Sequence, residues 1–122
     1  MIIPNWATMH VISKLQSRAH FVALESSRRL TVSDRWKIAI SKAEKPWISL
    51  GINPTWRFRV PADFDNLDFL VCVTANSDCF VIPTGDIWLD ADFIILTWPR
   101  KRKGGHFPDA HENWRLFSDV RI

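Results

Sequence analysis

The spacing of apolar residues near the start of the chain predicts a helix followed by a short strand. Four large apolar side chains recur at helical spacing, namely Trp6, Met9, Ile12 and Leu15. Asn5 can cap the helix that carries them, and Pro4 before it is typical of a helix start. The helix is expected to run to about Arg18. Residues 20–25 are apolar enough for a short buried strand, and residues 26–29 predict a turn.

Alternation of apolar and polar residues predicts further strands. Residues 30–42 form either one long strand or a bent pair, with the side chains of Ile38 and Ile40 on one face. Other predicted strands are residues 47–50, 67–74, 79–82 and 93–98. The second and third of these make a hairpin whose first strand is apolar on both faces, so we expect it to be buried on both. The remaining expected elements are a loop or helical turn at 53–61, a short helix from Thr84 to Asp90, and another at 109–117.

Length and composition fit one folded domain, residues 1–122. Hydrophobic residues make up 47% and charged residues 24%, which allows a core and argues against disorder. No apolar run approaches the ~20 residues that a membrane helix needs. The N-terminal residues lack the basic and apolar regions of a signal peptide, so we expect a cytoplasmic protein.

Two cysteines flank the predicted hairpin turn. If Asn76 and Ser77 form a tight two-residue turn, Thr74 faces Cys79, and Cys72 lies on the same face one pair further along. The resulting diagonal spacing of ~7 Å is long for a disulfide. We therefore predict buried free thiols, and the spacing of the cysteines does not match a metal site.

Charge is segregated along the chain, although the net charge is only +3. Residues 1–62 carry +7, residues 63–99 carry −7, and residues 100–122 carry +3. Either the folded molecule has one face that attracts phosphate and another that repels it, or these charges mix and cancel. The acidic stretch lacks the glycine and glutamate of a calcium loop. Its aspartates are expected in turns and helix caps, or on a face that mimics nucleic acid.

Four adjacent cations are the best binding signal in the sequence, namely Arg100, Lys101, Arg102 and Lys103. Two glycines follow them, so we expect an exposed loop. Such a loop releases counterions from a phosphate backbone and binds with little sequence preference. We predict that it contacts nucleic acid, the alternative being a solvated loop. Arg28 and Arg29 in the predicted turn are a second candidate.

Four fragments carry a resemblance to a known group of proteins. They are residues 38–47 (IAISKAEKPW), 68–73 (DFLVCV), 80–83 (FVIP) and 113–117 (NWRLF). In this order they resemble the PD-(D/E)XK, or restriction-endonuclease-like, nucleases, over most of residues 5–117. The resemblance implies a single α/β (α+β) domain with a central mixed β-sheet flanked by helices, and descent from a DNA endonuclease.

The resemblance also implies a Mg²⁺-dependent site, most of whose residues are replaced. Such a site needs clustered carboxylates around the ion, with an acid and a lysine two residues apart on one strand face. In the register that keeps Ile38 in the core, the two positions are Ala39 and Ser41. A shift of one residue makes Lys42 the lysine and Ile40 the acid position. Neither register supplies a metal ligand.

Other residues are candidates to replace the missing ligands. The resemblance places His20 where the preceding strand offers an acid, although a structural histidine is the ordinary interpretation. Glu25 and Asp34 flank the turn and are candidates to supply carboxylates, Asp34 as the metal ligand, the alternative being ordinary surface acids. Lys42 is then the catalytic lysine that stabilises developing charge, or else a solvated lysine at a strand end.

Three functions follow from these features. The first is a nucleic-acid-associated protein with a nuclease fold, acting on DNA with Mg²⁺ if it is active, but with weakened or lost cleavage. The second is a small binding protein or inhibitor that reuses the fold, for example a phage-encoded antagonist of a defence nuclease. The third is an interaction domain that forms a homodimer through exposed tryptophans, with Trp56, Trp88 and Trp98 the first candidates.

Overall fold

A five-stranded mixed sheet forms the centre of the molecule. The structure is a computed structural model in which residues 3–45, 55–88, 90–97 and 110–117 are described. The strands of the sheet, in spatial order, are β1 (Val22–Ser26), β2 (Arg29–Val32), β3 (Trp36–Ala43), β5 (Phe69–Thr74) and β6 (Cys79–Pro83). β3 and β5 are parallel, and the other neighbours are antiparallel. The predicted α+β domain with a mixed sheet is confirmed, and residues 30–42 contribute to a bent pair, β2 and β3.

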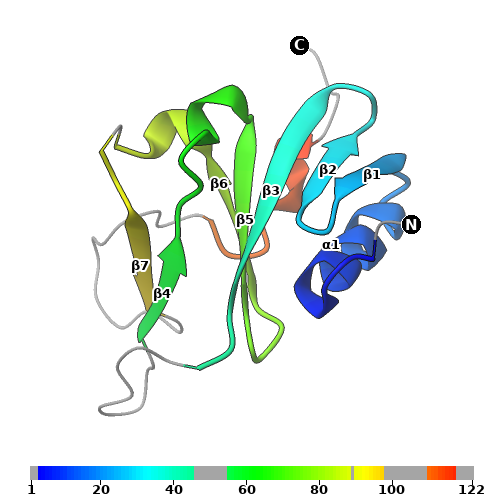
Figure 1. Cartoon of the computed structure of the whole chain (residues 1–122). Coiled ribbons are helices and arrows are strands. Elements are labelled where there is room, and N and C mark those ends of the chain that lie inside the picture. The colour runs from blue at the N-terminus through cyan, green and yellow to red at the C-terminus, as the bar shows by residue number, and fades with distance from the viewer. Residues whose placement is uncertain (1–2, 46–54, 89, 98–109, 118–122) are drawn as a thin grey trace.

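Different elements cover the two faces of this sheet (Figure 1). Helix α1 (Trp6–Gln16) lies on one face, with the 3-10 turn η3 (Trp114–Phe117). A two-stranded antiparallel ribbon of β4 (Thr55–Arg59) and β7 (Phe93–Thr97) lies on the other. The 3-10 turns η1 (Phe64–Asn66) and η2 (Thr84–Asp86) flank β5 and β6. In the described part of the chain, no helix is long and apolar enough to cross a membrane.

Strand alternation divides the interior into two cores. All six residues of β5 are buried, as predicted for a strand covered on both faces. Val71 and Val73 belong to the core beneath α1, whereas Leu70 and Cys72 belong to the core beneath the ribbon. The ribbon is therefore held to the sheet by a complete apolar layer.

The predicted helix forms, but its buried stripe differs from the expected one. Asn5 caps α1, because its Oδ1 accepts the backbone N–H of Thr8 at 2.8 Å. The buried residues are Ala7, Thr8, Val11 and Leu15. Trp6 and Met9, expected in the stripe, are exposed. The buried stripe therefore runs through Ala7, Val11 and Leu15, and it turns Trp6 and Met9 outward.

The turn between β5 and β6 is longer than the sequence analysis supposed. Ser77 adopts a left-handed conformation with φ 68°, and the Thr74 hydroxyl accepts the backbone N–H groups of residues 76 and 78. The partner of Cys79 is therefore Val73, and the expected pairing with Thr74 is wrong. Cys72 and Cys79 consequently face opposite cores, and both are free and buried as predicted. Burial raises the pKa of the Cys79 thiol to about 12.

Two expected segments have different structures. Residues 55–59, expected within a loop or helical turn, are strand β4. The short helix after β6 is the single turn η2, and Thr84 does not cap it, because its hydroxyl donates instead to the backbone oxygens of Leu67 and Asp68. This contact ties η2 to the start of β5. The strand predicted at 47–50 lies outside the described residues.

Glu112 joins the C-terminal segment to the sheet and to α1. Its carboxylate oxygens accept the backbone N–H of Cys79 at 2.8 Å and the indole N–H of Trp114 at 3.0 Å, and Lys14 Nζ lies 3.4 Å away. Burial alone raises the pKa of Glu112, but the hydrogen bonds from Trp114 and Cys79 and the charge of Lys14 outweigh it, so the pKa is below its usual value. Ionised Glu112 therefore stabilises the fold.

We expect Glu112→Gln to destabilise the protein by about 1 kcal/mol at neutral pH, because it weakens charge-assisted hydrogen bonds at a partly exposed site. The pKa of Glu112 is lower in the folded state than the unfolded value of 4.5. Its stabilisation is thus complete above the unfolded pKa and lost as pH falls through the folded pKa. Urea unfolding from neutral pH to about pH 3 measures this. The gap between wild type and variant is expected to shrink on acidification; a constant gap would contradict this account.

Candidate nucleic-acid interface

The end of β3 carries the predicted catalytic lysine. Lys42 Nζ lies 2.8 Å from Glu44 Oε1 and 5.9 Å from the centre of the Trp6 ring. The hydrogen bond and charge of Lys42 hold the pKa of Glu44 below its usual value. Ile40, on the same strand face, is buried in the core beneath α1. The position two residues before Lys42 is thus a packing position, and Glu44 is the carboxylate that the described residues place beside the lysine.

His20 and Asp34 lie at the opposite end of the β2–β3 hairpin. His20 Nδ1 lies 3.3 Å from the Ser33 hydroxyl, and its ring meets Phe117 edge-on at 6.2 Å. Asp34 is in the turn between β2 and β3, with φ 54°. Because β3 rises about 3.3 Å per residue, the six residues from its start to Lys42 put the two ends roughly 20 Å apart.

Glu25 lies near the face of the sheet that points away from α1, opposite to the face that carries Lys42. Its carboxylate accepts the Thr31 hydroxyl at 3.0 Å. Thr31 pairs with Lys37 in the β2–β3 ladder, so it faces away from α1, whereas Lys42 faces toward α1. The four candidate catalytic and metal-binding residues do not converge.

In the part of the chain that the structure describes, the candidate residues do not fit a Mg²⁺ site. Mg²⁺ prefers oxygen ligands, supplied in a cleavage site by clustered carboxylates. Within the described ranges, no three His, Cys, Asp or Glu side chains gather where they could hold a metal ion. Glu44 beside Lys42 is one ligand where two or three are needed.

The two predicted basic groups lie differently. Arg28 is exposed in the β1–β2 turn. Both terminal nitrogens of the Arg29 guanidinium donate hydrogen bonds to the Asp63 carboxylate oxygens, at N···O distances of 2.7 and 3.1 Å. This contact lowers the pKa of Asp63. Arg29 is therefore neutralised within the protein. Residues 100–103 lie outside the described residues, three positions beyond the end of β7.

The outer face of the ribbon is a basic surface that the sequence analysis missed. On β4, Trp56 and Phe58 are buried, and Arg57 and Arg59 between and after them are exposed. Arg59 pairs with Phe93 across the ribbon. The guanidinium carbons of Arg57 and Arg59 lie 4.5 and 5.5 Å from the centre of the Phe93 ring. One aromatic ring thus holds two cations side by side on the outer face.

The pattern that reveals this surface is present in the sequence. Residues 56–60 alternate strictly between apolar and basic residues, Trp-Arg-Phe-Arg-Val. Such alternation is typical of a strand covered on one face. The prolines at 54 and 61 suggested a loop instead, although they bound the strand on either side.

Comparison with solved structures shows what the fold is similar to. The structure of a bacterial homing endonuclease, I-Ssp6803I, is similar to this chain with a TM-score of 0.69 and 17% sequence identity, over 90% of this chain and 84% of that one. No protein-family model and no curated protein matches the sequence. At this level of identity the similarity concerns the fold. The chain has a nuclease-like fold.

Proposed function

We propose that the chain binds duplex DNA on the outer face of the β4–β7 ribbon. The observation that carries this proposal is the pair Arg57 and Arg59, held side by side over Phe93 on an exposed two-stranded ribbon. The major groove of DNA is wide enough to admit such a ribbon. Guanidinium groups bind phosphate oxygens and also the edges of guanine bases.

The position of the basic run supports the same surface. β7 ends at Thr97, and residues 100–103 follow it directly in the sequence. Four further cations are therefore tethered to the ribbon by a few residues. The homing endonuclease with a similar fold makes nucleic acid the natural ligand to test.

We further propose that the fold is that of the PD-(D/E)XK nucleases and that cleavage is weakened or lost. In the register that makes Lys42 the lysine, Ile40 stands at the position of the acid, and in the other register Ala39 and Ser41 take the two positions. A buried isoleucine cannot hold a divalent ion, and Glu44 alone supplies too few carboxylate ligands beside Lys42. DNA binding without cutting is the function that these residues support best.

A nicking assay tests the loss of chemistry. We expect the wild-type protein to retard supercoiled plasmid in Mg²⁺ or Mn²⁺ without converting it to nicked or linear forms, and we expect Lys42→Ala to behave identically. Nicking by the wild type that disappears in Lys42→Ala would show that an active site survives around this lysine, contrary to the proposal.

A further inference from the structure

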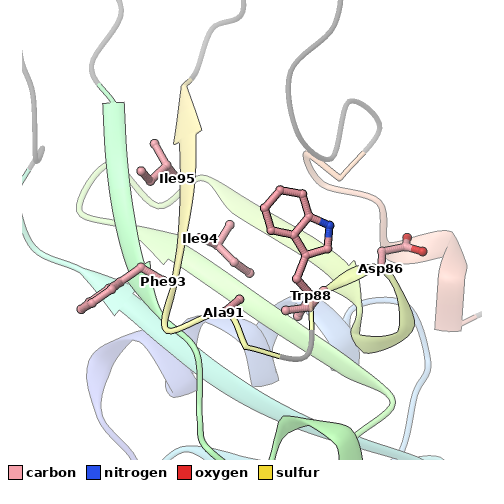
Figure 2. Close-up of a pocket in the computed structure, with 7 residues that line it drawn as sticks. Asp86, Trp88, Ala91, Phe93, Ile94 and Ile95 are labelled. Carbon is pink, nitrogen blue, oxygen red and sulfur yellow. The ribbon is translucent and has the colours of Figure 1, made fainter.

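The outer face of the ribbon carries two rows of side chains with different chemistry. The arginine row on β4 consists of Arg57 and Arg59, and the apolar row on β7 consists of Phe93 and Ile95. Arg57 pairs with Ile95 across the ribbon. Figure 2 shows Phe93 and Ile95 projecting from one side of β7 and Ile94 from the other. Cations and exposed apolar side chains therefore lie next to each other on one face.

Ile95 leaves apolar surface open beside these cations. The Phe93 ring is already engaged, because the guanidinium groups of Arg57 and Arg59 lie over it. Ile95 is 44% exposed and has no polar atom in its side chain. Asp92 is exposed and immediately precedes Phe93, so Ile95 lies toward the end of the ribbon that is farther from this acid. Any group that docks on the arginine row must also lie against Ile95.

The major groove of DNA offers such a side chain one kind of apolar partner. The base edges there present nitrogen and oxygen donors and acceptors, and the apolar exception is the 5-methyl group of thymine. The arginine row can take the acceptors, because guanidinium groups bind phosphate oxygens and the O6 and N7 atoms of guanine. Ile95 can bind none of these polar groups, so the thymine methyl group is the feature that it matches.

The spacing of the ribbon suits the spacing of base pairs. Side chains two residues apart on a strand lie about 6.8 Å apart, which equals two base-pair steps of about 3.4 Å. Residues directly opposite each other, such as Arg57 and Ile95, have Cβ atoms about 5 Å apart. The two side chains therefore reach neighbouring or next-neighbouring base pairs.

We propose that Ile95 reads the methyl group of a thymine in the major groove while the arginine row holds the duplex; this rests on the proposed binding of duplex DNA. A second copy of the chain fits this face less well. Two ribbons packed face to face would bring Arg57 and Arg59 of both copies into one interface, where like charges repel each other. The phosphates of DNA attract the same cations and bring the base edges to Ile95.

Duplexes that contain uracil in place of thymine test the proposal, because they lack the methyl group and keep the same hydrogen-bonding groups. Two repeating sequences cover both arrangements: GT·AC places thymine on the guanine strand, and GA·TC places it on the opposite strand. Burial of one methyl group corresponds to a preference of roughly fourfold. In fluorescence anisotropy titrations we expect the wild type to prefer the thymine form of at least one sequence by such a factor.

Variants at the same position separate a contact with the methyl group from an effect of thymine on the shape of the duplex. Ile95→Ala is expected to bind the thymine and uracil forms equally, with the affinity that the wild type has for the uracil form. Ile95→Val is expected to retain part of the preference. Because Ile95 is exposed, unchanged binding of the uracil form also shows that the variant is folded.

Equal binding of the thymine and uracil forms by the wild type in both sequences, or a preference that survives in Ile95→Ala, overturns the thymine contact and leaves DNA binding standing. Loss of all binding in Ile95→Ala overturns it too, because Ile95 would then be needed for the structure of the ribbon. Failure of the wild type to bind any of the duplexes overturns the proposed function as well. A dimer that dissociates in Ile95→Ala, detected by light scattering, would show that a second copy covers the ribbon and would contradict the proposal.

Discussion

Replacing Arg57 and Arg59 by alanine is expected to weaken duplex binding by roughly 50-fold at about 0.1 M salt. Each arginine that neutralises a phosphate contributes about 0.9 to the slope of log affinity against log salt. Loss of both therefore lowers the slope by about 1.8 and, at this salt, the affinity by nearly two orders of magnitude. Anisotropy titrations of a labelled duplex at several salt concentrations measure both quantities.

A matched control separates this effect from a simple change in net charge. Arg18→Ala with Arg115→Ala removes the same charge from exposed positions near α1 and η3, on the other face of the sheet. We expect this double variant to bind with nearly wild-type affinity and slope. Equal losses in the two double variants would mean that binding depends on overall charge and not on the ribbon.

Trp114→Ala is expected to destabilise the protein by about 3–5 kcal/mol, a large part of the stability of a small domain. Trp114 is 1% exposed in the core beneath α1, stacked near Phe117 at a ring distance of 6.3 Å. Its removal leaves a cavity and deprives Glu112 of a hydrogen bond. Urea unfolding measures the change in the free energy of unfolding.

Trp88→Ala is the matched control for stability, because it removes the same side chain from an exposed position. Its expected effect is within about 0.5 kcal/mol. A comparable loss of stability in both variants would contradict the division of the tryptophans into core and surface residues.

Much of the fold could be predicted because local patterns coincide with tertiary burial. The apolar run 67–74 predicted a strand covered on both faces, and Asn5 predicted a helix start; both are confirmed. The position of α1's buried stripe could not be predicted, because Ala7 and Thr8 are buried while the larger Trp6 and Met9 are exposed. Hydrophobicity alone does not reveal which side of a helix offers the closest approach.

The candidate site was harder to predict, because it depends on contacts between distant segments. Nothing local to Arg29 indicates that Asp63, distant in sequence, neutralises it. The ribbon face likewise requires β4 to meet β7, which brings Arg59 onto Phe93. Strand pairing, not composition, creates the basic surface.

The acidic stretch shows the same dependence on tertiary structure. Asp63 binds Arg29, Asp68 accepts the backbone N–H of Lys37 at 2.8 Å, and Asp78 lies 3.0 Å from His111. These aspartates are used in separate places to fasten turns and strand ends. The charges that are segregated in the sequence are therefore partly paired in the fold.

Amide chemical shifts recorded during a titration with duplex DNA test the central claim most directly, because they report which surface the DNA touches. We predict that the largest changes fall on residues 55–59 and 93–97, the two strands of the ribbon. Changes concentrated instead on α1 and the end of β3 near Lys42, with the ribbon unaffected, would contradict this account and place the DNA where a nuclease would cut it.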